Sequence, residues 1–464
     1  MAEPVRIVSP VDGSTWAERA VASDEALETT VRTARDAQRS WADVDFAERT
    51  ALCTAFVDAV VGLGDRIVPE LAWQMGRPVG AGPGELRGFA ERGHHMIEIA
   101  PDALAPIDLP EKAGFERSIE RVPVGVVLCV APWNYPLLTA VNTIVPALMA
   151  GNAVVLKHAS QTLVVGERFQ EAADAAGLPP GLFSNLVLSH QQVSHALGRR
   201  WFDRINFTGS VEAGRTIERS AAGTFAGVGL ELGGKDPAYV RADADLAHTV
   251  ENVVDGAFFN SGQSCCGIER VYVHRSRFDE TVDAMAEAVA GYRLGSPLDA
   301  ETTLGPMVTG RAADGVRAQV GAALDAGATA VIGPGRFGHA DGGPGSPYLA
   351  PTLLTGVDHS MEVMAEESFG PVLGVMPVDD DARAVRLMND SPYGLTASVW
   401  TADIDAARSI GRQLETGTVY MNRADYLDPA LAWTGVKDTG RGVTLSALGY
   451  GELTRPKSFH LRTT

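Results

Sequence analysis

The chain has 464 residues, which is too long for one hydrophobic core and predicts two or more domains. Apolar residues make up 45% and charged residues 21% of the sequence, as is usual for a soluble globular protein. The net charge of −19 argues against nucleic acid and anionic membrane surfaces as partners.

The first hundred residues are predicted to be mainly helical, with helices over 25–37 and 47–61. From about residue 115, short β-branched runs alternate with turns and helical segments. This pattern is typical of parallel strands buried between helices, and we expect strands at 125–130, 152–156, 185–188 and 204–207. A second series predicts strands at 236–240, 269–273, 373–378, 397–400 and 418–421. We expect an exposed loop at 333–347 and an edge strand at 458–464.

The start of the chain and its cysteines indicate a reducing compartment. Residues 1–6 lack the basic start and apolar core of a signal peptide, and no apolar run is long enough for a membrane span. Four cysteines are too few for a disulfide scaffold. We therefore expect a cytoplasmic protein. The sequence has no CxxC pair and no His/Cys cluster, so we expect no metal site.

Cys265 stands out because it lies next to Cys266 in a turn rich in Gly, Ser and Gln. A sulfur on a tight loop is accessible to a ligand and close to backbone N–H groups, which favours a nucleophilic thiolate. The alternative is a small apolar side chain that only fills space.

Two segments are candidates for nucleotide binding. Gly209 and Ser210 follow the strand predicted at 204–207 and precede a helical segment, where backbone N–H groups meet phosphates. The G-x-G-x-x-G fingerprint is absent from this turn. Lys157 follows the strand predicted at 152–156, at the edge of the sheet where nucleotides bind. A lysine that only reaches solvent is an equally good interpretation.

Two further side chains suit carbonyl chemistry. Asn134 lies between two prolines, and its amide would donate to a developing oxyanion or simply belong to a turn. Glu231 lies between two leucines, and apolar surroundings raise the pKa of a carboxyl group towards that of a general base. Pairing of Glu231 with a nearby Arg or Lys is the alternative.

Taken together and in this order, these motifs resemble the aldehyde dehydrogenase superfamily over nearly the whole chain. The resemblance is carried by the segments Pro132-Trp133-Asn134, Lys157, Phe207-Thr208-Gly209-Ser210, Glu231-Leu232-Gly233-Gly234-Lys235, Gly262-Gln263-Ser264-Cys265, Glu366-Glu367-Ser368-Phe369-Gly370-Pro371 and Gly435-Val436-Lys437-Asp438-Thr439-Gly440.

The resemblance implies an α/β fold with a Rossmann-like cofactor domain at 1–105 and 124–232 and a catalytic domain at 233–440. It also implies a β arm at 106–123 and 441–464 that forms a homodimer or homotetramer. The implied activity is NAD(P)⁺-dependent oxidation of an aldehyde to its acid through a thiohemiacetal and a thioester.

The resemblance also implies residue roles. Cys265 would be the nucleophile, Asn134 the oxyanion donor and Glu231 the base that activates water. The cofactor would contact Trp133, Lys157, Gly209, Ser210, Glu367 and Phe369. The substrate pocket would be lined by Tyr135, Asn142, Ser264, Cys266, Arg423 and Trp433.

Three positions depart from the family pattern. Ser160 stands where many NAD-preferring relatives have a Glu that grips the adenosine ribose, which favours acceptance of NADP⁺. Thr143 and Thr444 replace the Lys and Glu of a second proton relay, so we expect no such relay.

The sequence indicates more than one kind of aldehyde substrate. Aromatic rings favour an apolar or mid-sized aldehyde. Arg423 is a solvated loop residue or, as the alternative, would meet the carboxylate of succinate semialdehyde or a similar semialdehyde. A CoA-acylating dehydrogenase is a weaker alternative because such relatives lack the base at Glu231, and a non-enzymatic role is weaker still.

Overall fold

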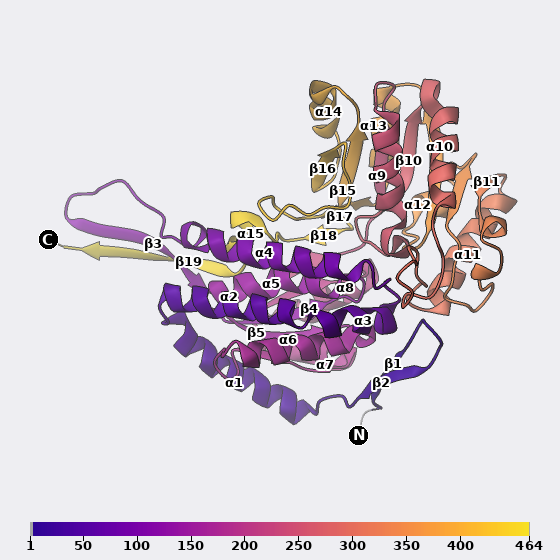
Figure 1. Ribbon diagram of the computed structural model, residues 1–464. Coiled ribbons are helices and arrows are strands. Elements are labelled where there is room, and N and C mark those ends of the chain that lie inside the picture. The colour runs from indigo at the N-terminus through magenta and orange to yellow at the C-terminus, as the bar shows by residue number, and fades with distance from the viewer. Residues whose placement is uncertain (1–2, 464) are drawn as a thin grey trace.

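The computed structural model describes residues 3–463, which form two α/β domains and a projecting two-stranded ribbon (Figure 1). The α-helices are α1 (Asp24–Ala42), α2 (Phe46–Gly62), α3 (Gly64–Met75), α4 (Gly82–Ala103), α5 (Pro136–Met149), α6 (Leu163–Ala175), α7 (His190–Gly198), α8 (Val211–Ala221), α9 (Leu246–Phe258), α10 (Phe278–Ala290), α11 (Gly310–Asp325), α12 (Glu362–Ala365), α13 (Asp381–Asn389), α14 (Ile404–Gly411) and α15 (Ser446–Glu452). Short 3-10 helices lie at η1 (Ser160–Thr162), η2 (Phe259–Gly262), η3 (Arg275–Arg277), η4 (Pro334–Arg336) and η5 (Gly338–Ala340).

The strands of the first domain and of the ribbon are β1 (Val5–Val8), β2 (Thr15–Arg19), β3 (Phe115–Pro123), β4 (Val126–Ala131), β5 (Ala153–His158), β6 (Phe183–Asn185), β7 (Arg204–Thr208), β8 (Gly227–Glu231), β18 (Gly440–Arg441) and β19 (Thr454–Arg462). Those of the second domain and its border are β9 (Asp236–Val240), β10 (Ile268–His274), β11 (Thr329–Ile332), β12 (Thr352–Thr355), β13 (Val372–Val378), β14 (Tyr393–Gly394), β15 (Thr396–Trp400), β16 (Thr418–Met421) and β17 (Val436–Lys437).

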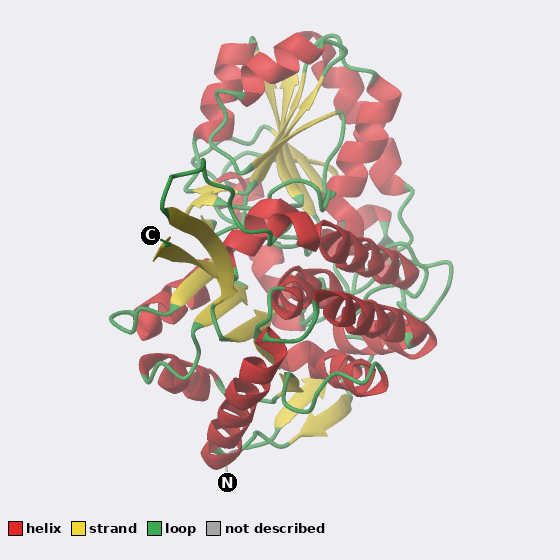
Figure 2. Cartoon of the chain, turned by 90° about the vertical axis from the view of Figure 1, so that its left-hand side faces the viewer, coloured by secondary structure: helices red, strands yellow, loops and turns green. Residues whose placement is uncertain are grey.

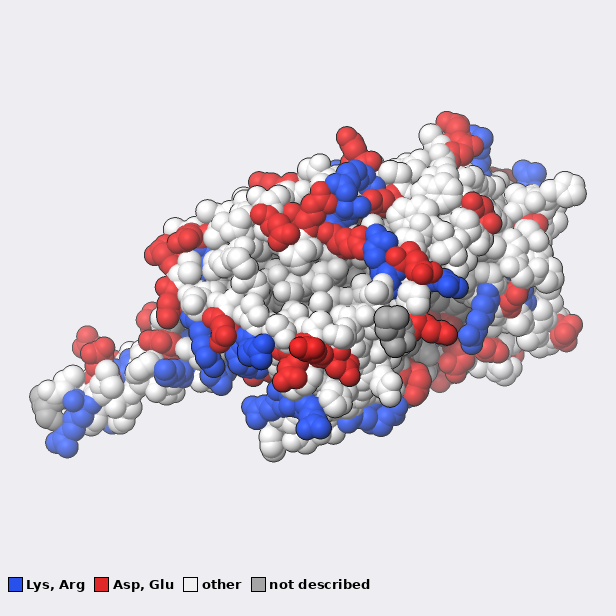
Figure 3. Space-filling view, turned by 90° about the horizontal axis from the view of Figure 1, so that it is seen from below, with Lys and Arg blue, Asp and Glu red and all other residues white. Residues whose placement is uncertain are grey.

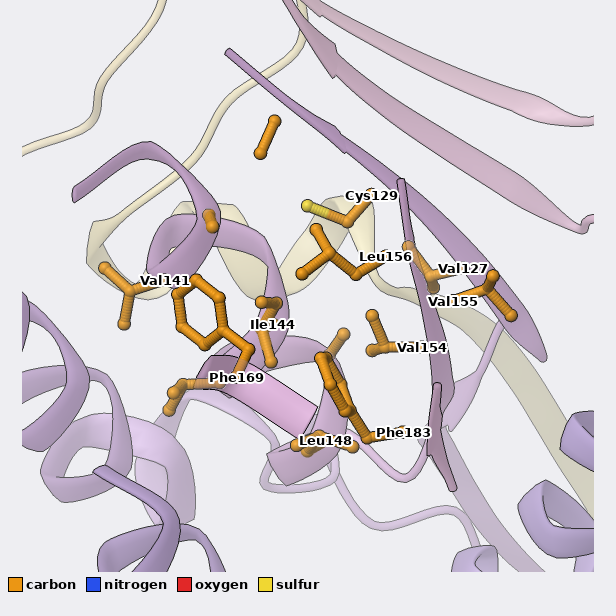
Figure 4. Close-up of a cluster of buried hydrophobic side chains, with 14 of the residues drawn as sticks. Val127, Cys129, Val141, Ile144, Leu148, Val154, Val155, Leu156, Phe169 and Phe183 are labelled. Carbon is orange, nitrogen blue, oxygen red and sulfur yellow. The ribbon is translucent and has the colours of Figure 1, made fainter. Parts of the chain in front are cut away.

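The first domain is built on a six-stranded sheet with the order β18-β8-β7-β4-β5-β6, parallel except for β18. Every residue of β4 and β5 is buried, as expected for central parallel strands covered by helices on both faces. Their side chains pack with those of α5 and α6 in a dense apolar cluster (Figure 4). This packing makes the sheet a rigid base for the loops at its edge.

The second domain has a seven-stranded sheet with the order β11-β12-β13-β10-β9-β15-β16, in which β11 alone is antiparallel. Figure 2 shows it as a twisted fan of strands between helices. The comparisons reported below confirm the predicted α/β fold class.

The ribbon pairs β3 with β19 in antiparallel register, from Thr454 opposite Pro123 to Arg462 opposite Phe115. It projects from the first domain, with the C-terminal end at its tip (Figure 1). β19 is largely exposed, whereas most residues of β3 are half-buried. The edge strand predicted at 458–464 instead spans Thr454–Arg462, and residue 464 of that prediction lies outside the described residues.

Two expectations about local structure need correction. The first hundred residues are mainly helical, but β1 and β2 form an antiparallel hairpin before α1. The strand predicted at 185–188 is instead Phe183–Asn185, because β6 pairs with Val154–Leu156 in that register. The predicted domain boundaries stay a prediction.

Acidic and basic side chains are interspersed over the face seen in Figure 3. Within residues 3–463, no helix combines the length and the apolar character that a membrane span requires.

Candidate active site

The site lies where the two sheets face each other. In the first sheet, the parallel strands β4, β7 and β8 end at Ala131, Thr208 and Glu231. The chain leaves β4 for one side of the sheet and returns to β7 on the other, so a crevice opens at their carboxyl ends. In the second sheet, β9, β10 and β13 are neighbours, and Cys265 precedes β10 by three residues.

Cys265 follows a turn with a strained backbone. Asn260, Ser261 and Gly262 have φ values of 54°, 58° and 69°, in the left-handed region that non-glycine residues rarely occupy. The Asn260 side chain donates to the carbonyl of Asn134 at 3.3 Å, and the Ser261 hydroxyl donates to a backbone carbonyl at 2.8 Å. These bonds hold the turn in a conformation that costs free energy, which is common at functional sites.

Two glycines allow the segment at 366–371 to lie close to its neighbours. A Cβ on Gly262 would lie 2.3 Å from the carbonyl oxygen of Gly370, so the backbone of this segment packs directly on the Cys265 turn. A Cβ on Gly233 would lie 2.4 Å from Oε1 of Glu367, so at the link between β8 and β9 the glycine makes room for the Glu367 carboxylate.

Arg77 connects the Cys265 turn to the Asn134 loop. Its guanidinium donates to the carbonyl of Asn134 at 2.5 Å and to Oδ1 of Asn260 at 3.2 Å. It also forms a fully buried ion pair with Glu85. Glu85 in turn accepts a bond from the backbone N–H of Leu137 at 2.8 Å, at the start of α5. This network fixes two loops from different domains relative to each other.

Asn134 is buried, and its amide donates to the carbonyl of Gln263 at 3.2 Å, two residues before Cys265. A side-chain amide has two N–H donors, so a second one is available for a ligand. The residue thus lies beside the Cys265 loop, where an oxyanion donor is needed.

Glu231 is held by two threonine hydroxyl groups. Thr444 donates to Oε1 at 2.5 Å and Thr208 donates to Oε2 at 3.1 Å. Burial raises the pKa of Glu231, while these two hydrogen bonds and the charge of Arg92 act in the opposite direction. A carboxylate with a raised pKa and a fixed orientation suits a general base.

The two relay positions behave differently. Thr444 contacts Glu231, as described above, whereas the Thr143 hydroxyl accepts a bond from the Asn206 side chain at 3.1 Å. Neither side chain is a carboxylate or an amine, so the two threonines orient polar neighbours and do not form an acid–base pair.

A buried ion pair holds the segment at 366–371. Lys235 and Glu269 pair at 2.5 Å, and Lys235 also donates to the Ser368 hydroxyl at 3.0 Å. Glu269 accepts the backbone N–H groups of Ser368 and Phe369 at 2.8 and 2.9 Å. Phe369 has a φ of 50°, and these bonds hold it in that conformation.

One cavity, the cofactor-side cavity, opens from Cys265 between the two domains and has a volume of about 690 Å³. Its lining includes Trp133, Asn134, Lys157, His190, Gly209, Ser210, Glu231, Cys265, Glu367 and Phe369. Ser210 caps α8 by accepting the N–H of Ala213 at 3.4 Å, so the positive end of that helix faces the cavity. Burial lowers the pKa of Lys157 to about 8.

The chemistry of this lining fits a nicotinamide dinucleotide. The helix N-terminus suits a pyrophosphate, and Glu367 offers a carboxylate to ribose hydroxyls. Glu367 accepts the N–H of Gly234 at 3.0 Å, and burial raises its pKa to about 7. Trp133 and Phe369 pack edge to face with centroids 5.6 Å apart, which gives the cavity an aromatic wall near Cys265.

A second cavity of about 280 Å³, the substrate-side cavity, lies on the other side of Cys265. Its lining includes Arg77, Glu85, Arg92, Tyr135, Leu138, Asn142, Glu231, Asp255, Cys265, Cys266, Asp425, Leu427 and Trp433. Asp425 accepts hydrogen bonds from Ser264 at 3.1 Å and from the Cys266 thiol at 2.9 Å. Burial raises the pKa of Asp425 to about 6.

Most predicted site residues meet at these two cavities, but three do not line either of them. Ser160 is exposed and borders a separate small cavity. Arg423 stacks on the ring of Tyr426 at 3.6 Å and is not among the residues that line the substrate-side cavity. Ser264 lies behind Cys266 and reaches the site through Asp425.

Sequence reasoning missed the charged residues of the substrate side. These are Arg77, Glu85, Arg92, Asp255 and Asp425. Two of them, Glu85 and Arg92, are buried on α4, and Arg77 is buried just before that helix. Charged residues on the otherwise apolar face of α4 were the sequence feature that could have indicated them. Within residues 3–463, no cluster of three or more metal-ligating side chains is present.

The arrangement as a whole suits attack on a carbonyl. Cys265 and Glu231 line both cavities, with the Asn134 amide beside them. A nucleophile, an oxyanion donor and a base therefore meet at the junction of a small cavity and a dinucleotide-sized one.

The sequence matches the aldehyde dehydrogenase family over residues 1–459. It is 35% identical over 444 residues to geranial dehydrogenase of Castellaniella defragrans, covering 95% of this chain and 91% of that protein. It is 32% identical to an NADP⁺ succinate-semialdehyde dehydrogenase of Deinococcus radiodurans, over 98% and 94% of the two chains. An indole-3-acetaldehyde dehydrogenase of P. syringae, solved with NAD⁺ and IAA, superposes with a TM-score of 0.93 at 30% identity and covers 99% of this chain and 93% of its own.

Proposed function

Since this chain belongs to the aldehyde dehydrogenase family and is an NAD(P)-dependent oxidoreductase, we propose that it oxidises its aldehyde through a thioester on Cys265. The observation that carries the proposal is the position of Cys265 between the two cavities, with Asn134 and Glu231 beside it. A CoA-acylating reaction is less well supported, because Glu231 supplies the base for hydrolysis.

The first step is addition of the Cys265 sulfur to the carbonyl carbon of the aldehyde. The carbonyl oxygen becomes an oxyanion, which the free N–H of the Asn134 amide and the backbone N–H of Cys265 stabilise. Arg77 fixes the position of the Asn134 loop relative to the Cys265 turn. The two N–H donors therefore need little reorganisation as negative charge develops on the substrate oxygen.

When bound in the cofactor-side cavity, NAD(P)⁺ supplies the acceptor for the hydride that leaves the substrate carbon. Trp133, Phe369 and Glu367 would hold the nicotinamide end, and Ser210 and Lys157 the pyrophosphate and adenosine end. Loss of the hydride leaves a thioester on Cys265.

Hydrolysis of the thioester requires an activated water molecule. Glu231 takes a proton from this water, the oxygen attacks the acyl carbon, and the acid leaves as the Cys265 sulfur departs. Because Glu231 acts as a base in its ionised form and burial raises its pKa, the rate of this step falls as the pH drops through that raised value.

We infer that NADP⁺ is accepted alongside NAD⁺. Lys157 lies in the cofactor-side cavity, and no described residue forms an ion pair with it, so its ammonium group is free for a 2′-phosphate. His190 lines the same cavity, and burial together with the charge of Lys157 lowers the pKa of His190, so the two side chains lie within electrostatic reach of each other. Ser160 lies outside the cavity lining. As a neutral side chain it does not repel a 2′-phosphate as a glutamate at that position would.

The remaining proposals concern size and assembly. The substrate-side cavity of about 280 Å³ suits a small or mid-sized aldehyde. The exposed β3–β19 ribbon offers unpaired strand edges, so we infer a homodimer or homotetramer that covers it.

The test is NAD(P)H formation at 340 nm with a panel of aldehydes, with and without CoA, for the purified protein and its Cys265→Ala variant. We expect CoA-independent turnover that Cys265→Ala abolishes, while cofactor binding by the variant persists. Turnover by Cys265→Ala would contradict the thioester route, and a strict requirement for CoA would identify the acylating alternative.

A further inference from the structure

Three arginines are almost fully buried near the active site or in the second sheet, and they differ in how their donors are used. Arg77 and Arg270 are 2% and 1% exposed, and Arg92 on α4 is 7% exposed. Arg77 pairs with Glu85. Arg270 has no carboxylate partner, but its Nε, Nη1 and Nη2 all donate to backbone carbonyls. Both guanidinium groups are therefore satisfied by the protein itself.

Arg92 is the exception. Only its Nη1 has partners, the carbonyl of Leu138 at 2.8 Å and Oδ1 of Asn142 at 3.5 Å. Within residues 3–463, Nε and Nη2 have no hydrogen-bond partner, and Arg92 forms no ion pair. A buried guanidinium stays protonated, and leaving its charge and donors unmatched is costly. The protein alone does not complete this group.

The unmatched side of Arg92 belongs to the substrate-side cavity. Arg92 lines that cavity together with Cys265, Asn142 and Trp433. Burial lowers the pKa of Arg92, and the charges of Cys266, Glu231, Asp425 and Cys265 oppose that effect, so all four groups lie within electrostatic reach. A ligand attached to Cys265 would therefore have Arg92 within its surroundings.

The other charges around the cavity leave Arg92 as its one unmatched cation among the described residues. Arg77 is neutralised by Glu85. Asp425 is already satisfied by two donors, Ser264 and Cys266. Arg423, the candidate cation considered from the sequence, stacks on Tyr426 and is not part of the lining.

We infer that Arg92 is a specificity-determining residue that receives a carboxylate at the far end of the substrate, so that the preferred substrates are short ω-carboxylated aldehydes. Nε and Nη2 lie on one edge of the planar guanidinium and match the two oxygens of a carboxylate. This inference rests on the proposed aldehyde oxidation. It replaces Arg423 as the anion-binding residue and narrows the mid-sized aldehyde to one with a negative end.

The experiment compares succinate semialdehyde with butanal, which has the same four-carbon chain and no charge. The variants are Arg92→Met, Arg92→Lys, the rival Arg423→Met, and Arg87→Met as a matched control from an exposed position of the same helix. A second readout is calorimetric binding of succinate to the inactive Cys265→Ala protein, with and without Arg92→Met. Circular dichroism and melting temperatures establish that each variant is folded.

We expect the wild type to prefer succinate semialdehyde in kcat/KM. Arg92→Met should lower kcat/KM for succinate semialdehyde by about 10- to 150-fold more than kcat/KM for butanal, because a charged hydrogen bond is lost with the first substrate only. Any loss through the effect of the Arg92 charge on Glu231 is common to both aldehydes and cancels in this ratio. Arg92→Lys should lose less, because it keeps the charge but not the paired geometry. Arg87→Met and Arg423→Met should have no selective effect, and succinate binding to Cys265→Ala should disappear with Arg92→Met.

Equal losses for both aldehydes in a folded Arg92→Met protein would overturn the inference, as would a selective loss in Arg423→Met. A wild type that oxidises butanal better than succinate semialdehyde would overturn it too, while the proposed oxidation would stand. If neither aldehyde is oxidised but succinate binding still depends on Arg92, the anion site stands and the proposed function fails.

Discussion

The two cavities that meet at Cys265 are built in different ways. The cofactor-side cavity is lined by turns at the ends of sheet strands, such as Gly209 after β7, and by the segment at 366–371, which is fixed by the Lys235–Glu269 ion pair. The substrate-side cavity is lined by one face of α4, the start of α5 and the loop that contains Asp425. The shape of the cofactor-side cavity therefore depends on backbone geometry, whereas that of the substrate-side cavity depends on side chains that can be replaced.

This difference implies that the two sides can be disturbed separately. Changes on the cofactor side should alter stability and cofactor binding but not the choice of aldehyde. Changes on the substrate side should alter the choice of aldehyde but not cofactor binding. Cys265 and Glu231 line both cavities and Asn134 lies beside them, so changes at these three residues should alter mainly the chemistry.

The largest expected effect is on stability. Lys235→Met removes one partner of a buried ion pair and leaves Glu269 uncompensated, which should lower the free energy of unfolding by about 3–5 kcal/mol. Chemical denaturation measures this loss, and KM for the cofactor should rise because the 366–371 segment loosens. The control is Lys437→Met in the more exposed pair with Glu415, which should cost under about 1 kcal/mol. A changed aldehyde preference in Lys235→Met would contradict the independence of the cofactor side and the substrate side.

The next effect is on chemistry. Asn134→Ala removes the side-chain oxyanion donor and should lower kcat by about 10²–10³-fold. Calorimetry should show unchanged affinity for the cofactor, because the residue acts on the substrate oxygen. A loss confined to KM would mean that Asn134 binds the ground state and not the oxyanion.

A smaller effect concerns the adenosine end of the cofactor-side cavity. Lys157→Met should weaken binding of NADP⁺ by about 10- to 150-fold and leave NAD⁺, the matched ligand without a 2′-phosphate, nearly unchanged. In the wild type, affinity for NADP⁺ should fall as the pH rises through about 8, because the Lys157 ammonium loses its proton there. Fluorescence titration of both cofactors between pH 6 and 9 checks this, and parallel pH curves for the two would contradict it.

The smallest effect is on the base. Thr444→Val removes a hydrogen bond that stabilises ionised Glu231, so its pKa should rise further. The acid limb of the kcat profile should then move to higher pH, with a loss of at most about tenfold below the new midpoint. Thr143→Val, which does not touch Glu231, is the matched control. An unchanged profile would show that hydrolysis does not limit kcat.

The sequence allowed much of the cofactor side to be predicted, because its motifs combine special backbone geometry with a fixed order. A Cβ on Gly262 or Gly233 would lie under 2.5 Å from a neighbouring atom, so only glycine fits at these positions. Such glycines at fixed places in a motif can be recognised in the sequence. The buried strands β4 and β5 were predictable for a similar reason, since only continuous apolar residues suit a strand covered on both faces. Family membership and fold class are confirmed by the comparisons.

The substrate side was largely beyond prediction. Arg92 interrupts an apolar helical face, which indicates burial, but no local pattern shows that it lines the substrate-side cavity while Arg423 stacks on Tyr426. Their difference arises from the packing of α4 against α5, which brings Arg92 beside Leu138 and Asn142. Such long-range placement is set by tertiary contacts and not by a motif.

The glycine contacts around Cys265 have a practical consequence for redesign. A mutant library for a new substrate gains nothing from Gly262, where every replacement forces apart two main-chain segments, or from Gly233, where a Cβ would displace the Glu367 carboxylate. Positions that reach the substrate through side chains alone, such as Asn142 and Leu427, can be randomised without disturbing that framework. Some positions should therefore be kept unchanged and others mutated. Most positions worth mutating lie on α4, α5 and the loop before Trp433.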